Sequence, residues 1–431
     1  MPGMKNKLYT DVLIIGGGVI GCSICWQLSK KGISTLLVEK SGIATGSSGA
    51  CDGFIFLQSK KDKDIVKLTF RSMGMFENLA EELSYDIEFE KCGGLVINNN
   101  VSGINSSISN NTGISAKGRN IVGFKKLSSV ELRKIEPMIS ESIMSATLCE
   151  SEGQVNPINL NFGFAQASKK NGARLLTGEE VIKIDVELSD ERLEPAGKDI
   201  KGKDSKNCKE PGSGGRETDK VKKIGKVYTS SDKEIIAKEV VCACGAWSEV
   251  LGKLLGYRIP VIPRKGILIV TEALPRVIDH VILDYDYICS KFDDKDNDFG
   301  FTIEQTKSGN LLIGSTREFS GFNDRIDFGK VSQLICKAKK FFPFLGDVNI
   351  IRIFSGFRPY SASKLPIMGK ALEFENFWVA AGHEGDGIAL SPVTGLLMGS
   401  IIAEKIKSGK ILGDFSGISI GKFSPQPQNI L

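Results

Sequence analysis

The sequence predicts an α/β fold, α+β overall, that combines a nucleotide-binding unit with an antiparallel sheet. A strand, a glycine-rich turn, a helix and a second strand follow one another between residues 9 and 40. A further strand, glycine turn and helix begin near residue 239, as in the far half of a dinucleotide-binding fold. From residue 259 to 317, short apolar runs alternate with turn residues, and successive hairpins of this kind form an antiparallel sheet.

The composition is that of an ordinary globular protein. The chain has 431 residues, of which 41% are hydrophobic and 25% are charged, enough for two domains and a large core. The formal net charge of +5 is small, and no basic stripe with interleaved aromatic residues occurs, which argues against a nucleic-acid partner. We find no signal peptide, and the longest apolar region, 377–402, contains His383, Glu384 and Asp386, which argues against a membrane span.

The ten cysteines are scattered, many of them within apolar runs. They are typical of reduced, buried thiols in a cytoplasmic protein. Cys22 and Cys25 form a C-x-x-C pair, but they fall on the packing face of the first predicted helix, where small core residues are expected. Cys242 and Cys244 have no partner pair nearby, so we assign no metal site.

The N-terminal unit carries the clearest motif. Residues 11–15 form an apolar, β-branched run, and Gly16, Gly18 and Gly21 follow in G-x-G-x-x-G spacing. The three glycines allow a tight turn, close approach of a pyrophosphate and close helix packing, respectively. The helix is expected to end near Lys30, and a second run, 35–38, ends in Glu39, a residue suited to a ribose hydroxyl. The alternative is a plain βαβ turn that needs only small residues.

The next stretch alternates loops with regular elements. Residues 41–54 form a small-residue loop that either contacts the ligand or lies on the surface. Periodicity predicts helices at 64–85, 127–135 and 157–170, strands at 89–98 and 145–149, and a loop at 99–118. A strand or strand pair is expected at 174–187. Residues 189–226 mix lysine, acids and glycine, so we expect a solvated, mobile hairpin insertion, with a basic docking patch as the alternative.

The C-terminal half returns to strands and ends in a helix. Strands are expected at 226–229 and 234–241, and the strand-rich region includes the runs 280–292, 300–306 and 310–318. A helix is predicted at 326–342 and strands at 350–355 and 377–380. Ser391 and Pro392 have the pattern of an N-cap followed by a first-turn proline, so the last helix is expected to run from there to about Lys407.

Four motifs together resemble one enzyme family. GGGVIG followed by Glu39-Lys40, the central CACGAWS, GFRPYSASKLPIMG and AGHEGDGIALSPVTG occur in the order found in the FAD-dependent D-amino acid oxidase superfamily, in its glycine oxidase and sarcosine oxidase branch. The run from Lys291 to Phe322 is most similar to the catalytic subunits of opine oxidases, hydrogen cyanide synthase and hydroxyproline dehydrogenase. The resemblance spans most of the chain except 99–118 and 189–226.

The resemblance implies a Rossmann-like FAD-binding domain with an inserted antiparallel-sheet substrate domain. The FAD-binding domain would comprise residues 6–91, 152–256 and 353–410, with the mobile insertion at 189–226. The substrate domain would comprise residues 92–151 and 257–352, and residues 411–431 would form a C-terminal tail.

The resemblance also assigns site residues. Arg358 falls where the family has its substrate-carboxylate arginine, and a guanidinium suits bidentate binding of a carboxylate. A surface salt bridge is the alternative role for Arg358. The cofactor-binding set is Gly16, Gly18, Val19, Ile20, Gly21, Glu39, Lys40, Ser47, Ser48, Val181, Gly245, Gly382, His383, Gly385, Asp386, Gly387 and Ile388. Arg264 and Lys265 would lie near the flavin, and the helix beginning at Ser391 would direct its N-terminus at the flavin.

The expected activity is oxidation of a C–N bond in a small amino acid or secondary amine, of glycine, sarcosine, D-amino acid, proline or opine type, by hydride transfer to FAD. The alternative is an FAD-bearing electron-transfer subunit that is inactive without a partner chain. An NAD-dependent dehydrogenase is disfavoured because the sequence has only one G-x-G-x-x-G unit. No residue for covalent flavin attachment and no oxygen-activating lysine is assigned, so oxidase and dehydrogenase both stay open.

Overall fold

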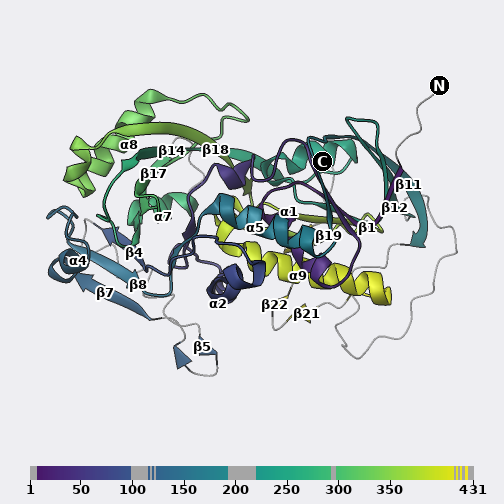
Figure 1. Ribbon diagram of the computed structural model, residues 1–431, viewed down its shortest axis with the longest axis horizontal. Coiled ribbons are helices and arrows are strands. Elements are labelled where there is room, and N and C mark those ends of the chain that lie inside the picture. The colour runs from purple at the N-terminus through teal and green to yellow at the C-terminus, as the bar shows by residue number, and fades with distance from the viewer. Residues whose placement is uncertain are drawn as a thin grey trace, which may run out of the picture.

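Two eight-stranded sheets organise the chain. The structure is a computed structural model that describes residues 7–98, 115–116, 119–120, 123–192, 220–292, 298–411, 414–415, 418–419 and 423–425. Figure 1 shows the second sheet, with α4, α7 and α8, toward one end of the molecule, and α1, α2, α5 and α9 gathered beside the first sheet. This is the mixed α/β architecture that the sequence predicts.

The first sheet contains the N-terminal nucleotide-binding unit. Its order is β10-β2-β1-β13-β12-β11, and β20 pairs with β13 and with β19. The pairings of β1 with β2 and with β13 are parallel, so the predicted N-terminal unit and the strand near residue 239 lie side by side. The strands are β1 (Lys7–Ile15), β2 (Thr35–Glu39), β10 (Arg174–Thr177), β11 (Val181–Arg192), β12 (Lys220–Thr229), β13 (Glu234–Cys242), β19 (Ile367–Lys370) and β20 (Phe377–Ala381).

Four helices pack together beside this sheet: α1 (Val19–Lys30), α2 (Lys63–Leu83), α5 (Pro157–Lys170) and α9 (Gly387–Ser408). α1 and α9 approach closely, because a Cβ on Gly395 would lie 2.1 Å from Ser23 Oγ. The Ser23 hydroxyl also donates to the Ser391 carbonyl at 2.8 Å. α9 is long and apolar enough to cross a membrane, but 78% of its most apolar window is buried inside the protein, as in a core helix.

The second sheet has the order β18-β14-β17-β16-β15-β4-β8-β7. All of its pairings are antiparallel except that of β15 with β4. The strands are β4 (Gly94–Asn98), β7 (Phe124–Ser128), β8 (Ser145–Cys149), β14 (Val261–Ala273), β15 (Val281–Asp284), β16 (Asp298–Gln305), β17 (Asn310–Arg317) and β18 (Ile350–Ser361). Its apolar face, with Ile267, Phe301 and Leu311, packs against α8 (Phe328–Phe341).

The remaining described elements are short. They are α4 (Ser129–Ile135), α6 (Ser248–Leu254), α7 (Tyr285–Phe292), η1 (Ser47–Gly49), η4 (Gly245–Trp247), η5 (Pro343–Asp347) and η6 (Glu384–Asp386). Three two-stranded pairings complete the set: β3 (Phe54–Ile55) with β9 (Gly153–Gln154), β5 (Ser115–Ala116) with β6 (Arg119–Asn120), and β21 (Asp414–Phe415) with β22 (Ile418–Ser419). Most of the predicted loop at 99–118 lies outside the described residues.

The run at 280–292 is not a single strand. β15 ends at Asp284, and residues 285–292 form α7. The Asp284 carboxylate accepts from the Tyr287 N–H at 2.8 Å and from the Phe301 N–H at 3.1 Å. The aspartate therefore caps the first turn of the helix and also joins it to β16, which the aromatic and β-branched composition of the run does not reveal.

Both predicted boundaries of the insertion at 189–226 are wrong, because regular strands extend into it from each side. β11 continues to Arg192 and β12 begins at Lys220, and the two strands pair with each other. Val221, Ile224 and Val227 are buried at a spacing of three residues, and the pairing with β11 shifts register at Gly225, so the buried positions do not follow the two-residue period of a regular strand. The high lysine content thus concealed a half-buried strand, and the part of the prediction that falls on 193–219 lies outside the described residues.

The last helix begins earlier than predicted. α9 starts at Gly387, and Pro392 lies inside it rather than in its first turn. Proline removes one backbone donor, and the Ser391 hydroxyl donates to the Ile388 carbonyl at 2.9 Å, which replaces that donor. The helix N-terminus therefore lies in the glycine turn of residues 384–387 and not at Ser391.

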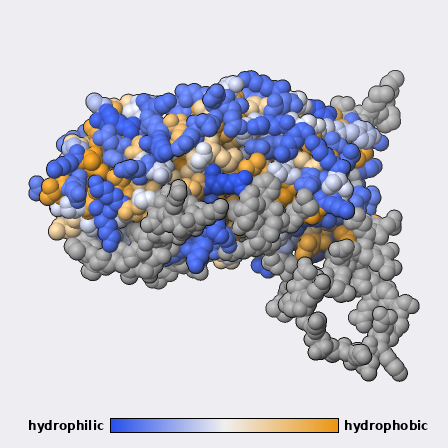
Figure 2. All heavy atoms as spheres, turned by 90° about the horizontal axis from the view of Figure 1, so that it is seen from below, coloured by the Kyte–Doolittle hydropathy of each residue, from blue (hydrophilic) through white to orange (hydrophobic). Residues whose placement is uncertain are grey.

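The surface agrees with the balanced composition. On the face seen in Figure 2, hydrophilic side chains predominate and hydrophobic ones are scattered among them. Two exposed isoleucines, Ile350 and Ile351, begin β18, the edge strand of the second sheet.

Candidate active site

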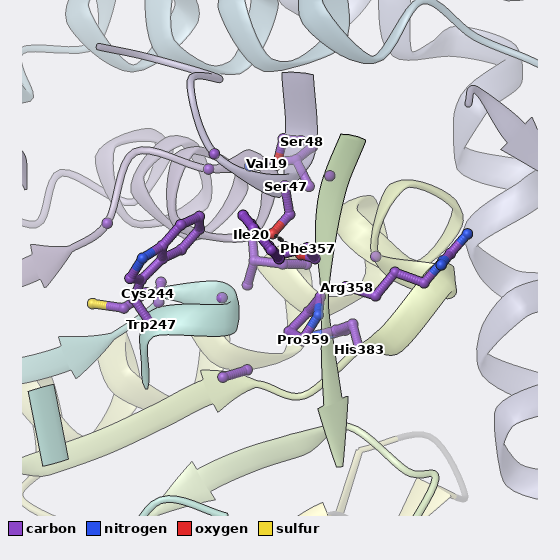
Figure 3. Close-up of a pocket in the computed structure, with 18 of the residues that line it drawn as sticks. Val19, Ile20, Ser47, Ser48, Cys244, Trp247, Phe357, Arg358, Pro359 and His383 are labelled. Carbon is purple, nitrogen blue, oxygen red and sulfur yellow. Dashed lines mark hydrogen bonds between the residues drawn. The ribbon is translucent and has the colours of Figure 1, made fainter. Parts of the chain in front are cut away.

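A cavity of about 320 Å³ lies where the two sheets meet. Its walls come from the turn between β1 and α1, the loop 45–54, the turn η4, the strands β14 and β18, and the turn before α9. Figure 3 shows Trp247 and Arg358 on opposite sides of Ser47 and Ile20, so different elements close the two ends of the cavity. Its size is in the range of small-molecule sites.

The glycine turn follows the geometry expected of its sequence. Gly16 has φ +115°, and a Cβ there would lie 2.4 Å from the Ala243 carbonyl oxygen. A Cβ on Gly21 would lie 2.0 Å from the Gly16 carbonyl oxygen, so Gly21 permits the close packing of α1. Gly18, the N-cap residue of α1, makes no side-chain cap of its own. The Val19 N–H is bound by Ser48 Oγ and the Gly17 N–H by Glu39, so the backbone of Gly18 and Ile20, which also line the cavity, is the part of this turn that would face a phosphate.

Glu39 is held firmly at the end of β2. Its carboxylate accepts from the Gly17 N–H at 2.7 Å and from the Ser41 N–H at 3.0 Å. Lys40 follows, with its ammonium 5.2 Å from the Trp247 ring centroid. Trp247 stacks on Phe322 with the ring centroids 5.2 Å apart. This end of the cavity thus combines an acid, a cation and a flat aromatic wall.

The small-residue loop meets the cavity and the neighbouring elements. Ser48 Oγ accepts from the Val19 N–H at 3.0 Å, and the Ser47 hydroxyl donates to the Phe357 carbonyl at 2.5 Å. Gly245, with φ +52°, faces Ser47, and Val181 lines the cavity from the start of β11. The loop is therefore fixed between α1 and β18 rather than free on the surface.

The turn before α9 combines lining and supporting residues. His383 is buried, its ring Nε2 lies 3.2 Å from Thr394 Oγ1, and burial lowers its pKa to about 4, so the imidazole is neutral near pH 7. Asp386 pairs with the buried ammonium of Lys60. This ion pair ties the start of α9 to the segment before α2.

Most of the predicted site residues come together in this one cavity. The lining residues are Gly16, Gly18, Val19, Ile20, Glu39, Lys40, Ser47, Ser48, Val181, Gly245, Arg358, His383, Gly385, Gly387 and Ile388. Gly21, Gly382 and Asp386 do not line it. Gly21 packs under the turn, Gly382 packs against Ser361 and Val261, and Asp386 pairs with Lys60.

Arg358 projects from β18 over a glycine of β14. A Cβ on Gly266 would lie 2.4 Å from Arg358 Nη1, so only glycine leaves room for this guanidinium. Arg358 Nη1 donates to the Thr316 carbonyl at 3.0 Å and Nη2 donates to Ser315 Oγ at 2.6 Å. Although burial disfavours the charged form, Tyr287, Glu384 and Asp52 raise the pKa of Arg358 above its ordinary value. The arginine is therefore held in place as a cation.

Arg264 and Lys265 lie on opposite faces of β14. None of the Arg264 guanidinium nitrogens has a hydrogen-bond partner among the described residues, although the side chain is fully buried. Its nearest anion is Glu384, 3.8 Å away, and the rings of Phe319 and Tyr360 flank it. Lys265 instead pairs with Glu318 at 3.2 Å and does not line the cavity, which corrects its expected place near the flavin.

Sequence reasoning missed four cavity residues with chemistry of their own: Asp52, Glu384, Tyr287 and Trp247. The sequence could have indicated Asp52, because it is an acidic residue in a loop of small residues that was itself expected to contact the ligand. Tyr287 had none, because its segment was assigned to a strand. It lies beside Arg317, whose guanidinium carbon is 3.9 Å from the Tyr287 ring centroid.

The residues present fit FAD. Side chains at Gly16 and Gly18 would occupy the space that a pyrophosphate needs, and Glu39 lies beside this turn at the end of β2. Trp247, Ile20 and several small residues line the cavity between this turn and Arg358. The cavity has a phosphate-binding turn on one side and an arginine on the other. This arrangement suits FAD bound with its pyrophosphate at the turn and its flavin ring beside the arginine, where a substrate would bind.

Comparisons with known proteins give one consistent result. The sequence model of a family described as FAD dependent oxidoreductase (DAO) matches residues 11–401. The hydrogen cyanide synthase subunit HcnC of Pseudomonas aeruginosa is 26% identical over 463 residues, which cover 98% of each chain. Glycine oxidase of Geobacillus kaustophilus is 27% identical, covering 92% of this chain and 93% of that protein. An opine oxidase subunit of Rhizobium meliloti is 21% identical, covering 96% of this chain and 98% of that protein.

Solved structures share the fold. The glycine oxidase structure from Geobacillus kaustophilus superposes with a TM-score of 0.77 at 24% identity, covering 98% of this chain and 100% of that chain. L-proline dehydrogenase from P. horikoshii gives a TM-score of 0.75 at 21% identity, covering 98% and 97%.

Proposed function

This chain belongs to the DAO family of FAD dependent oxidoreductases, and we propose that it oxidises a carbon–nitrogen bond of a small amino acid or secondary amine. It is an FAD-dependent oxidoreductase of the glycine oxidase, opine oxidase and proline dehydrogenase type, which acts on amines or amino acids. The proposal adds that the substrate carries a carboxylate, that the product is an imine and that the hydride goes to flavin N5.

The Gly16–Gly21 turn and Glu39 would hold the ADP half of FAD, with Ser47 and Ser48 beside the pyrophosphate or ribitol. The turn before α9 would border the flavin ring. When bound, FAD supplies the two-electron acceptor for the hydride from the substrate carbon. The protein residues then bind the substrate, orient its Cα–H bond and manage its protons.

The observation that carries the proposal is the position of Arg358. Its guanidinium faces the cavity from β18, above Gly266, with Tyr287, Asp52 and Glu384 in the same lining. A partly buried cation of this kind favours an anionic group of the ligand, and a guanidinium fork suits a carboxylate. The carboxyl groups of Asp52 and Glu384 lie in the same lining and would attract the ammonium group of the same amino acid.

An anaerobic substrate screen tests the proposal. The purified protein should be yellow and should release FAD on denaturation. Glycine, sarcosine, D-alanine, L-proline, hydroxyproline and an opine would be mixed with it in turn, while the absorbance of the oxidised flavin is followed. Bleaching by at least one carboxylated amine is expected, whereas the matching amines without a carboxylate should bleach it far more slowly. A colourless protein, or bleaching that ignores the carboxylate, contradicts the proposal.

A second candidate function is that of an electron-transfer subunit, favoured by two relatives that are named as subunits. In that case the chain would reduce its flavin only in the presence of a partner chain. Co-purification from the native source, followed by the same screen on the complex and on the lone chain, distinguishes the electron-transfer subunit from the independent enzyme.

We further propose a cytoplasmic location, which the expected reduced cysteines support.

A further inference from the structure

Glu384 has an unusual backbone conformation for a residue of the cavity lining. It begins the short turn η6, and its φ of +50° lies in the left-handed region that glycine prefers. Its Oε2 accepts from the N–H of Gly385, and its side chain is only 9% exposed. Residues other than glycine are kept in such a conformation mostly at functional sites, where the position of the side chain matters.

The guanidinium of Arg264 lies beside this carboxylate. Arg264 Nη1 is 3.8 Å from Glu384 Oε1. Arg264 is fully buried between the rings of Phe319 and Tyr360, and its guanidinium nitrogens have no hydrogen-bond partner among the described residues. Burial lowers the pKa of Arg264, whereas the charge of Glu384 raises it. Because a buried cation needs a counter-charge, each member of this ion pair favours the ionised form and the position of the other.

The turn η6 also passes alongside Arg358. A Cβ on Gly385 would lie 3.8 Å from Arg358 Cδ and Nε, and Glu384 is one of the groups that raise the pKa of Arg358. Arg358 is the expected partner of the substrate carboxylate. In an α-amino acid the nitrogen is attached to the carbon next to that carboxylate, so it must lie close to Arg358. Glu384 therefore places an anion near the expected position of the substrate nitrogen.

Asp52 is the other acid in this part of the lining. Burial raises the pKa of Asp52 above its ordinary value, although Arg358 and Arg317 oppose this. Asp52 thus holds its negative charge against its own burial, whereas Glu384 has a guanidinium at 3.8 Å. Of the two acids, Glu384 is better suited to be a permanent anion.

We propose that Glu384 selects substrates whose nitrogen carries a positive charge, and that Arg264 is the positioning residue that holds the Glu384 carboxylate for this contact. This inference rests on the proposed function, because it needs a carboxylated amine bound at Arg358. It narrows the substrate class to amino acids that bind as zwitterions. Primary, secondary and fully alkylated ammonium groups all meet this requirement, whereas an uncharged group in the same place does not.

The test compares ligands of equal shape that differ in one charge. α-Aminoisobutyrate carries an ammonium group where pivalate carries a methyl group, and glycine betaine carries a quaternary nitrogen where 3,3-dimethylbutyrate carries a carbon. None of the four can be oxidised to an imine, because each lacks either a Cα–H bond or a nitrogen lone pair. Their Kd values would be measured on the FAD-loaded protein by flavin absorbance or calorimetry. The ratio of the two Kd values within a pair then measures selection for the positive charge.

The wild type should bind the charged member of each pair about 10–100-fold more tightly, as expected for one charge-assisted contact. Glu384→Gln keeps the size of the side chain and should bring the ratio close to one, while the affinity for the uncharged member stays nearly the same. A wild-type ratio in Glu384→Gln overturns the inference. A ratio that collapses in Asp52→Asn but not in Glu384→Gln also overturns it and gives the role to Asp52.

Variants of Arg264 test whether this residue acts through Glu384. Arg264→Met fills similar space between the two aromatic rings but removes the counter-charge, so the ratio should fall, and Arg264→Lys should restore part of it. The double variant Arg264→Met/Glu384→Gln should have the ratio of Glu384→Gln alone. If the two effects add in the double variant, Arg264 binds the ligand directly and its positioning role is wrong. A wild-type ratio in the Arg264 variants that fold overturns that role as well.

Glu318→Gln is the matched control. Glu318 is also a buried glutamate in an ion pair, but its partner is Lys265 on the other face of β14. Glu318 lines neither this cavity nor a second cavity of about 390 Å³, which the loop 48–52 separates from the first. The ratio should stay at its wild-type value in Glu318→Gln. A collapse equal to that of Glu384→Gln would mean that any lost ion pair has this effect, and the inference would be wrong.

Flavin measurements distinguish a substrate contact from a cofactor contact. The FAD content and the spectrum of the oxidised flavin should be nearly the same in Glu384→Gln and in the wild type. If Glu384→Gln loses FAD or shifts its spectrum while the ratio is unchanged, Glu384 supports the flavin and does not select the substrate.

The outcomes also distinguish this inference from the proposed function. If no carboxylated amine bleaches the wild-type flavin, the proposed function is wrong and this inference falls with it. If such amines bleach the flavin but the wild type binds the charged and uncharged ligands equally, or binds none of the four, the function stands and the role of Glu384 is wrong.

Discussion

Arg358 of β18 lies directly opposite Arg264 of β14 in the antiparallel pairing of the two strands. Directly opposed side chains of an antiparallel pair lie on the same face of the sheet, so both guanidinium groups come from the face that carries Gly266 and Leu268 into the cavity. They diverge, because Arg358 bonds Thr316 and Ser315 of the β17 region whereas Arg264 lies beside Glu384. Arg358 is thus directed at the ligand space, and Arg264 at the turn before α9.

Arg358→Ala should lower kcat/KM for a carboxylated amine by roughly two to three orders of magnitude, since loss of one partner of a buried ion pair costs about 3–5 kcal/mol. Arg358→Lys should recover only part, because an ammonium lacks the guanidinium fork. Steady-state kinetics and flavin content are the measurements, and FAD content should stay near normal.

Arg276→Ala is a suitable control for the arginine, because Arg276 is partly exposed, bonds Glu90 and Asp279, and lines neither cavity. An amine without a carboxylate should turn over equally slowly with the wild type and with Arg358→Ala. Full activity of Arg358→Ala on the carboxylated substrate, or simple loss of its flavin, would transfer the role to Arg264 or Arg317.

Gly18→Val should abolish FAD binding while the protein still folds. A Cβ on Gly18 would have only Ser48 Oγ near it, at 3.3 Å, so the apoprotein accommodates it, but the branched side chain fills the approach of the pyrophosphate. The measurements are flavin absorbance and circular dichroism.

Gly16→Ala is the contrasting variant, since its Cβ would collide with the Ala243 carbonyl at 2.4 Å and the protein should be unstable. Gly74→Ala in α2, where no atom lies within 4 Å, should be neutral or slightly stabilising. Normal FAD content in Gly18→Val would remove the phosphate role from this turn.

Replacement of residues 193–219 by a short Gly/Ser linker should cost little stability, because the free energy of loop closure depends weakly on length. The strand ends must be kept, since Ile224 of β12 is buried and its N–H donates to Asn376 Oδ1 at 2.8 Å. Thermal unfolding would show a similar Tm for this variant, whereas removal of all of 189–226 should lower it clearly. Limited proteolysis should cleave within 193–219 first, and complete resistance there would contradict this prediction.

A feature of the fold or of the site could be predicted from the sequence when residues close to it in the chain determine its geometry. Gly16, Gly18 and Glu39 could be predicted because their geometry is set by neighbours within the same βαβ unit. The start of the last helix was placed at Ser391-Pro392 because this pair matches a local N-cap pattern, whereas α9 begins at Gly387, next to Asp386, whose ion pair with Lys60 joins residues far apart in sequence. The hydrogen bond between the Gly53 N–H and Glu304 could not be predicted from the sequence, since only the packing of β16 behind the loop 48–52 brings these two residues together.

Oxygen should be a poor electron acceptor, with a partner protein or a quinone taking the electrons. The resemblance to multi-subunit dehydrogenase chains motivates this prediction, and Lys265, the lysine next to the cavity face of β14, is bound to Glu318 at 3.2 Å. Turnover would be compared with oxygen and with an artificial dye as acceptor. Hydrogen peroxide production by the lone chain at the rate seen with the dye would count against the prediction.

The stability of the fold should depend on pH through Glu152. Burial raises the pKa of this carboxyl from 4.5 to about 7, even though it accepts from the N–H groups of Leu57 and Gln58 at 2.6 and 2.7 Å. A group whose pKa is higher in the folded state than in the unfolded state binds more protons when folded, so its contribution is complete below pH 4.5 and is lost as the pH rises toward 7.

Glu152→Gln should therefore flatten the stability profile between these pH values and make the protein more stable than the wild type at alkaline pH, by an amount on the order of a few kcal/mol at most. The amide oxygen keeps both backbone hydrogen bonds, but the new amide nitrogen replaces the Oε2 that accepts from Gln58 Nε2 at 2.9 Å, so the Gln58 amide must turn over to present its Oε1 as the acceptor. Urea unfolding at several pH values measures the effect. A parallel downward shift of Glu152→Gln at every pH would mean that the charged hydrogen bonds, and not the burial of the carboxylate, dominate at this position.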